Sequence, residues 1–313
     1  MWMTDDTTRL GAERTLCVYG PSQSGKTTQL GVLAERIFRQ TQKKSRLYMM
    51  DPGGYGSILP YVKVGILEVV DLVGRPRPWE WMDQITKGGL PVVTNGKESW
   101  QVRDPKDDSI AGWFFDSMTG GGDVLMSEAA KAAATGRNIG GQPPNFKLTE
   151  GTVTVAGNSP SHYGSVQGVM AQNIKQSFLL PGTVVWTATS RSAQDEDGQG
   201  VPTMIGPQLV GKALTAEIPR WFNYTFRLVT IPGSPALNKK EEHRLYLRPL
   251  QDATTGAAGA ILTNNRAPLD SANDIPEFIS PASIDKALDL LENAGDAAEA
   301  AIRARLAGIL PAQ

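Results

Sequence analysis

Residues 20–27 read Gly-Pro-Ser-Gln-Ser-Gly-Lys-Thr, and this segment constrains the expected architecture more than any other. An apolar run precedes it at 15–19, and residues 27–41 follow it with apolar side chains at helical spacing. The order predicts a strand, a loop and a helix. Glycine lets such a loop wrap closely around a ligand, and the N-terminus of the helix adds a dipole that favours an anion. The segment therefore predicts an anion site at the end of a strand.

The spacing of the two glycines, the lysine and the threonine matches the phosphate-binding loop. In that motif, backbone N–H groups surround the phosphates, the lysine reaches the β- and γ-phosphates, and the hydroxyl ligates Mg2+. Taken over from the motif, these roles fall on Lys26 and Thr27. The residues predicted to bind the nucleotide are Gly20, Pro21, Ser22, Gln23, Ser24, Gly25, Lys26, Thr27 and Thr28. We therefore expect ATP and Mg2+ as the cofactors.

A second pattern lies at 110–115, where an apolar run ends at Asp116. In enzymes with the phosphate-binding loop, an aspartate at the end of such a strand holds the magnesium ion through water. The expected metal site therefore consists of Thr27 and Asp116.

Apolar runs alternate with helical patterns along much of the chain, which predicts an α/β fold with a mostly parallel sheet flanked by helices. Strands are expected at 15–19, 45–50, 64–70, 110–115 and 183–187, and helices at 27–41, 78–87 and 167–180. Apolar runs at 222–230 and 243–250 predict two late strands that close one edge of the sheet.

Several additions to this core are expected. Residues 91–102, with an Asn-Gly pair at the middle, predict a hairpin with a tight turn. Residues 120–165 open with three glycines and contain a proline pair, which predicts a long irregular insertion. A helical tail is expected in which Asp296 caps the final helix, and it packs either on its own domain or on a neighbouring subunit. The expected division is an N-terminal arm at 1–14, an ATPase domain at 15–270 and the tail at 271–313.

The composition says little about partners. Lysine and arginine number 31 against 32 aspartates and glutamates, so the net charge gives no argument for a nucleic acid or a membrane. Cys17 is the only cysteine, which excludes an intrachain disulfide and fits an intracellular protein. No stretch approaches the ~20 apolar residues of a membrane span. We therefore expect a soluble protein in the cytoplasm.

Taken together, the motifs resemble a known family, the RecA-like ATPases. Within that family, the chain looks similar to the phage-encoded members linked to single-strand annealing and recombination, sometimes called the Sak type. The resemblance is carried by residues 20–28, by the strand ending in Phe115-Asp116-Ser117, by 184–189, by 205–223 and by 263–266. It covers about residues 14–270 and implies a RecA-like core.

The resemblance also implies roles in catalysis. Thr189, at the end of a core strand, would be a polar sensor of the γ-phosphate, although threonine is common in strands on propensity alone. RecA-like enzymes place a glutamate just after the second strand, where this chain has Asp51. Asp51 is the preferred residue to orient the attacking water, and Glu68 is the alternative. Weak hydrolysis, stimulated by a partner or by DNA, would follow if neither acid is well placed.

Arg266 is the preferred cation for presentation to the γ-phosphate of a neighbouring subunit, by resemblance to ring- or filament-forming relatives. A plain surface arginine explains the residue equally well, and Arg220, Arg191 and Lys212 compete for the role. A shared active site of this kind implies a homo-oligomer, either a ring or a filament.

The signals for single-stranded DNA are mixed. Such DNA is bound by a basic groove with stacking aromatic side chains, and the 120–165 insertion contains both kinds of residue. These residues are Lys131, Arg137, Phe146, Lys147, His162 and Tyr163. The loop 194–200, where RecA-like proteins touch DNA, carries three acids at 195–197 that would repel phosphates. Single-stranded DNA or a DNA-binding protein is therefore an expected partner, and a membrane is not.

The preferred interpretation is a phage RecA-like ATPase of DNA recombination, annealing or replication that uses ATP to switch its affinity for DNA. A helicase or a DNA-packaging motor would share the nucleotide-binding residues and differ in directional translocation. A nucleotide-stabilised structural or adaptor protein with little turnover is favoured by the missing glutamate and the neutral net charge. A small-molecule kinase is disfavoured because the sequence has no arginine-rich lid segment.

Overall fold

The computed structural model describes residues 12–306, apart from residues 52, 96, 105–106, 135–147, 151–152, 156–159, 194–203, 211–213, 234–239, 249–259, 262 and 266–274. The strands in this part of the chain are β1 (Ala12–Gly20), β2 (Lys44–Met49), β3 (Leu67–Asp71), β4 (Leu90–Thr94), β5 (Lys97–Gln101), β6 (Ile110–Asp116), β7 (Leu148–Glu150), β8 (Val153–Val155), β9 (Gly182–Ala193), β10 (Met204–Pro207), β11 (Tyr224–Ile231), β12 (Glu242–Tyr246), β13 (Ala260–Ile261), β14 (Asn264–Asn265) and β15 (Phe278–Ile279). The helices are α1 (Lys26–Thr41), α2 (Tyr55–Lys63), α3 (Pro78–Ile85), α4 (Met118–Ala134), α5 (Pro160–Ser177), α6 (Ile218–Trp221) and α7 (Ile284–Leu306).

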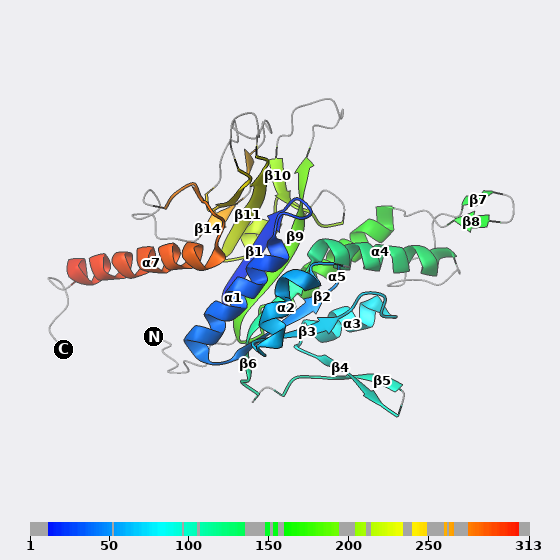
Figure 1. The fold of residues 1–313 in the computed structure, drawn as a ribbon. Coiled ribbons are helices and arrows are strands. Elements are labelled where there is room, and N and C mark those ends of the chain that lie inside the picture. The colour runs from blue at the N-terminus through cyan, green and yellow to red at the C-terminus, as the bar shows by residue number, and fades with distance from the viewer. Residues whose placement is uncertain are drawn as a thin grey trace.

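The main sheet is mostly parallel, as the sequence predicts (Figure 1). Along its longest path the strands lie in the order β15-β12-β11-β1-β9-β6-β2-β3. Every neighbouring pair from β11 to β3 is parallel, whereas β12 is antiparallel to both β11 and β15. The late strands β11 and β12 pair with each other as expected, but β11 also joins β1 inside the sheet. Strand β9 separates β1 from β6.

Helices cover both faces of the sheet. Side chains alternate between the two faces along each strand, so each strand contributes to the core on both sides. On β1, Leu16 and Val18 join a core cluster with residues of α1, α2 and α7. Cys17 and Tyr19 point to the other face and join a cluster with residues of α3, α4 and α5. All four side chains are fully buried. The apolar run of β1 is therefore continuous because neither of its faces meets water.

The predicted hairpin is confirmed as the antiparallel pair β4 and β5. Asn95 adopts a positive φ of 53°, which is the backbone conformation that a tight turn between such strands requires. Trp100 of β5 packs against the core cluster that contains the buried Trp81, and Arg75 forms an ion pair of 2.8 Å with Glu98. The tryptophans of this region therefore serve packing.

The expectation of a long irregular insertion at 120–165 is wrong for the residues described. Helix α4 takes up its first part, β7 and β8 form an antiparallel hairpin, and α5 begins at Pro160. The three glycines belong to the first turns of α4. An added Cβ on Gly121 would lie 2.8 Å from Met82 Cε, and one on Gly122 would lie 2.6 Å from Val210 Cγ2. These glycines therefore permit close packing of α4. A single sequence does not distinguish glycines with this role from glycines that form a turn.

In the described part of the tail, β15 precedes one helix, α7, that starts earlier than expected. The backbone N–H of Lys286 donates to Ser283 Oγ at 3.3 Å, so Ser283 lies at the cap position. The predicted cap, Asp296, lies inside the helix, and this prediction is wrong. Leucine and alanine are frequent on both sides of Asp296, and their helix propensity carries the helix through it. In the described part of the chain, none of the helices has the combined length and apolar composition needed to cross a membrane.

The first half of α7 packs against α1, which confirms the own-domain interpretation of the tail for that half. Ile284, Ala287 and Leu288 are buried in the cluster that contains the apolar face of α1. The side chain of Arg36 on α1 is only 5% exposed and forms ion pairs with α7. Its partners are Asp285, Asp289 at 2.6 Å and Glu292 at 2.9 Å. Gln29, three residues into α1, accepts a hydrogen bond from the backbone N–H of Ile284 at 2.8 Å.

Candidate functional site

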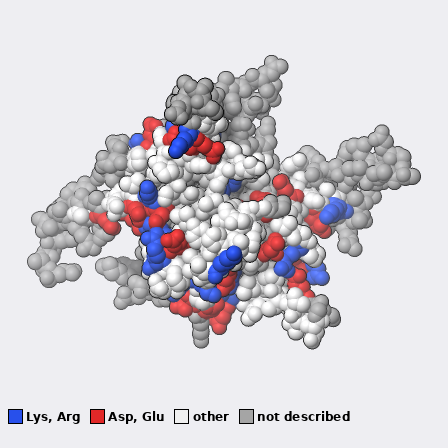
Figure 2. Space-filling model, in the orientation of Figure 1, with Lys and Arg blue, Asp and Glu red and all other residues white. Residues whose placement is uncertain are grey.

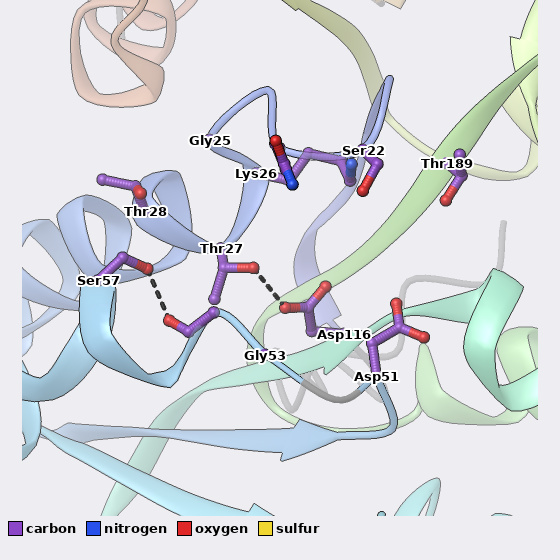
Figure 3. Close-up of a pocket in the computed structure, with 12 residues that line it drawn as sticks. Ser22, Gly25, Lys26, Thr27, Thr28, Asp51, Gly53, Ser57, Asp116 and Thr189 are labelled. Carbon is purple, nitrogen blue, oxygen red and sulfur yellow. Dashed lines mark hydrogen bonds between the residues drawn. The ribbon is translucent and has the colours of Figure 1, made fainter.

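A polar cavity of about 450 Å3 lies at the carboxyl edge of the parallel strands. The strand register brings Gly20 beside Thr189 and Met49 beside Asp116, so the ends of β1, β2 and β6 meet there. Thr189 was expected at the end of its strand, but β9 continues past it to Ala193 and pairs there with β10. The residues that line the cavity are Ser22, Gln23, Gly25, Lys26, Thr27, Thr28, Asp51, Gly53, Gly54, Ser57, Asp116 and Thr189. Figure 3 shows Thr28 and Ser57 on one side of Thr27 and Asp116, with Thr189 on the other.

The loop 20–25 connects β1 to α1, as the sequence predicts. An added Cβ on Gly20 would lie 2.1 Å from the carbonyl oxygen of Leu228, so glycine is needed for β1 to end this close to β11. Gln23 and Gly25 have positive φ values of 64° and 93°, which turn the loop back towards the helix. The backbone at the start of α1 faces the cavity with N–H groups that the helix itself does not pair. The loop and the helix end are thus arranged to receive an anion.

Of the predicted nucleotide-binding residues, Ser22, Gln23, Gly25, Lys26, Thr27 and Thr28 line the cavity. Gly20, Pro21 and Ser24 belong to the same loop without lining the cavity, and Ser24 is buried. The structure therefore places six of the nine predicted residues in the lining of one cavity.

Lys26 supplies a cation to the cavity. Its Nζ donates hydrogen bonds to the carbonyl oxygens of Gly20 at 3.1 Å and Pro21 at 2.8 Å. Burial lowers the pKa of Lys26, and the negative charges of Asp116 and Asp51 act in the opposite direction. The ammonium group therefore lies between the loop and two acids, within the cavity that the loop borders.

Asp116 is held by threonines from two different elements. Thr27 Oγ1, at the start of α1, donates to Asp116 Oδ2 at 2.7 Å, and Thr187 Oγ1, on β9, donates to Asp116 Oδ1. Asp116 is 4% exposed and Thr187 is fully buried. The sequence motifs predict the pair of Thr27 and Asp116 but give no indication of Thr187. The only signal in the sequence is that Thr187 is polar, lies in an apolar strand and is two positions before Thr189, hence on the same face of that strand.

Asp51 lies two residues after the end of β2, beside Asp116. The backbone N–H groups of Met50 and Asp51 reach the carbonyl oxygen of Asp116 at 2.6 and 3.3 Å, which ties the two strand ends together. Ser117 Oγ donates to Asp51 Oδ2. Burial raises the pKa of Asp51 and the charge of Asp116 adds to this, whereas the Ser117 hydrogen bond and Lys26 lower it. The cavity therefore contains two neighbouring carboxylates in different hydrogen-bond environments.

Thr189 lines the cavity beside Gly20, where the loop begins, and its backbone is fixed on both sides. Its N–H donates to Thr119 Oγ1 at 3.0 Å, and its carbonyl oxygen accepts from the N–H of Gln208 at 2.7 Å. Thr119 Oγ1 in turn donates to the carbonyl oxygen of Gln208 at 2.8 Å. The position expected of a polar sensor is thus held by α4 and by the residue after β10.

The turn before α2 also borders the cavity, although the sequence motifs do not point to it. Gly53 and Gly54 have positive φ values of 113° and 79°, and an added Cβ on Gly54 would lie 3.0 Å from Thr27 Oγ1. Ser57 Oγ donates to the carbonyl oxygen of Gly54 at 2.7 Å. The two glycines therefore let the chain pass close to Thr27 after β2 has ended.

Glu68, the alternative to Asp51, lies elsewhere. It sits on β3 three positions before Asp71, and it forms ion pairs with Arg46 at 3.1 Å and Lys44 at 3.4 Å. The described lining of the cavity does not include it. Asp51 is therefore the one of the two acids that the structure places at the cavity.

The candidate cations are not placed at the cavity within the described part of the chain. Arg266 and Lys212 lie outside the described residues, as does the side chain of Arg191. Arg220 lies on α6 with an exposed side chain and does not line the cavity.

Few of the candidate DNA-binding residues fall within the described chain. Lys131 is exposed and lies 3.9 Å from Glu128, and Tyr163 is 39% exposed. Arg137, Phe146, Lys147, the loop 194–200 and the side chain of His162 are outside the described residues. On the face seen in Figure 2, the described basic side chains are interspersed with acidic ones.

The chain matches no protein-family model, and a search of curated proteins finds no match for it. The fold and the site define a mixed α/β protein whose mostly parallel sheet is flanked by helices and carries a polar cavity at its carboxyl edge.

Proposed function

We propose that this protein is a Mg2+-dependent ATPase with a RecA-like core that acts in phage DNA recombination, single-strand annealing or replication. The observation that carries the proposal is the 2.7 Å hydrogen bond between Thr27 and Asp116 beside the loop 20–25. It joins the two motifs that the sequence predicts for nucleotide and metal, although they are far apart in the chain. Lys26 lines the same cavity.

The donor set fits Mg2+. This ion prefers oxygen ligands and is usually held by one or two protein groups together with substrate phosphates and water. The Thr27 hydroxyl and the Asp116 carboxylate are oxygen donors of that kind. When bound, Mg2+ would neutralise charge on the phosphate oxygens during the reaction.

The residues of the chain divide the work of hydrolysis among them. The N–H groups of the loop and of the start of α1 would bind the phosphates, and Lys26 would stabilise their negative charge. Water would form the new bond to the γ-phosphorus while the bond to the leaving ADP oxygen breaks. Asp51 would orient that water and accept its proton. Because an aspartate is one methylene shorter than the glutamate of the resembled family, we expect slow turnover without a partner.

The RecA-like assignment is supported by the place of Thr189 as well as by the resemblance in sequence. Strand β9 lies between β1 and β6, so Thr189 reaches the cavity from between the loop and Asp116. The role in DNA metabolism rests on the resemblance, and so does a homo-oligomer with Arg266 at its interface.

The test is ATP hydrolysis by the wild-type protein and Lys26→Ala, with and without single-stranded DNA, at low and at moderate salt. Lys63→Ala, which removes an exposed lysine of α2, is the matched control. Turnover that requires Lys26 and rises with DNA is the expected result. Nucleotide binding without turnover or DNA response would contradict the proposal and leave a nucleotide-stabilised structural protein. ATP-driven directional movement along DNA would indicate a motor instead.

A further inference from the structure

We propose that Ser117 is a positioning residue that holds the Asp51 carboxylate in place for hydrolysis, an inference that rests on the function proposed above. Ser117 follows Asp116 directly and is 1% exposed. It does not line the cavity, so it acts through Asp51 and not on the nucleotide.

The direction of the hydrogen bonds around Ser117 is determined by its neighbours. The backbone N–H of Gly120 donates to Ser117 Oγ at 3.1 Å, which is the bond of a helix N-cap at the start of α4. That bond uses a lone pair of the hydroxyl oxygen and leaves its proton free. The proton is directed to Asp51 Oδ2, which has no proton of its own to offer when ionised. The cap therefore fixes the hydroxyl, and the hydroxyl fixes the carboxylate.

The other oxygen of Asp51 is confined by the same turn of α4. An added Cβ on Gly120 would lie 1.8 Å from Asp51 Oδ1 and 2.7 Å from its Cγ. Only glycine leaves room for the carboxylate at this distance from the helix backbone. One turn of α4 thus contacts Asp51 twice, with a donor from Ser117 and a space left by Gly120.

The alternative role for Ser117 is capping alone, and two variants separate the roles. Ser117→Ala removes the cap and the donor together. Ser177→Ala removes another buried serine hydroxyl, which accepts from Trp186 Nε1 at 2.9 Å and donates to Ile174 away from the cavity. It is the control for loss of stability. Ser117→Thr keeps both the cap and the donor and should rescue the defect.

The experiment is the measurement of kcat and KM for ATP hydrolysis in the wild-type protein and these variants. In Ser117→Ala we expect kcat to fall by about 10- to 100-fold and KM to change by less than about threefold, because the residue acts through Asp51 and not on the nucleotide. Ser117→Thr should restore most of the lost kcat, and Ser177→Ala should keep the kcat of the wild type. In an Asp51→Asn background, Ser117→Ala should cause no further loss, because its effect passes through Asp51.

A kcat in Ser117→Ala equal to that in Ser177→Ala, a failure of Ser117→Thr to restore kcat, or a full further loss in the Asp51→Asn background would each overturn the role of Ser117 and leave the ATPase proposal intact. Absence of hydrolysis in the wild type would overturn both.

Discussion

Thr27 Oγ1 donates a 2.7 Å hydrogen bond to Asp116 Oδ2 across 89 positions of the sequence. The bond crosses from the first turn of α1 to the end of β6, which is separated from β1 by β9. Thr187 of β9 donates to the other oxygen of the same carboxylate. The intervening strand therefore takes part in the site, and its threonine helps to orient the acid proposed to hold Mg2+.

Replacing Thr27 by alanine should weaken the dependence of nucleotide binding on Mg2+. The variant loses a hydroxyl that the proposed metal site uses, and Asp116 loses a hydrogen-bond donor. We expect the gain in ATP affinity on adding Mg2+ to fall by about tenfold or more, measured by isothermal titration at several Mg2+ concentrations. Thr27→Ser retains the hydroxyl and should retain the gain. An equal Mg2+ response in Thr27→Ala and the wild type would remove Thr27 from the metal site.

Asp51→Asn should stabilise the protein at neutral pH and not in acid. The folded pKa of Asp51 is raised, so the folded state favours the neutral carboxyl, and ionised Asp51 costs free energy above its folded pKa. The cost appears as the pH rises from the unfolded value through the folded one and is absent below both. We expect a Tm increase on the order of 2 °C at pH 8 that disappears near pH 3. Asp108→Asn, at a side chain 85% exposed, is the control. A decrease in Tm at pH 8 would contradict the sign.

Local sequence patterns predict much of the fold, because many of its helices, strands and turns are determined by short stretches of sequence. The strand, loop and helix around 20–27 follow from an apolar run, two glycines and a helical period. The hairpin of β4 and β5 follows from an Asn-Gly pair. Asp116 could be assigned because an upstream loop motif gave meaning to an acid at a strand end. The placement of Asp51 at the cavity agrees with its position after β2.

Contacts between residues far apart in the chain cannot be predicted from such local patterns. Nothing near Thr187 or Ser117 in the sequence says which carboxylate each will face, because that depends on the order of strands in the sheet. The sequence predicts an irregular segment at Gly120. A single sequence does not distinguish a glycine that makes room for Asp51 from a glycine that turns the chain. The sequence around Asp296 resembles a helix start. The helix begins earlier, at Ile284, where α7 packs on α1, and the residues near Asp296 carry no information about that packing.

Two helical glycines should respond to alanine in opposite directions. Gly168 of α5 has open space around its Cα, with nothing within 4 Å of an added Cβ. Gly168→Ala should raise the free energy of unfolding by about 0.5–1 kcal/mol because alanine favours the helix. Gly120→Ala places a methyl group against Asp51 and should lower it by about 1–3 kcal/mol.

Urea unfolding of both glycine variants gives the two free energies directly. The pair is matched because each change adds one methyl group to a helix. A Gly120→Ala variant as stable as Gly168→Ala would mean that α4 does not hold Asp51 as closely as 1.8 Å from the added methyl position.

Arg36 should hold the first half of α7 to α1. Its guanidinium is 5% exposed and contacts three carboxylates of α7, whereas Arg39 on the same helix is 57% exposed. Arg36→Ala leaves a cluster of acids without their shared cation, which should cost about 1–3 kcal/mol of unfolding free energy, less than for a fully buried pair because the acids are partly exposed. Arg39→Ala should cost less than about 0.5 kcal/mol. Hydrogen exchange of the α7 amides should accelerate in Arg36→Ala and not in Arg39→Ala, and equal exchange in the two variants would show that apolar packing alone retains the helix.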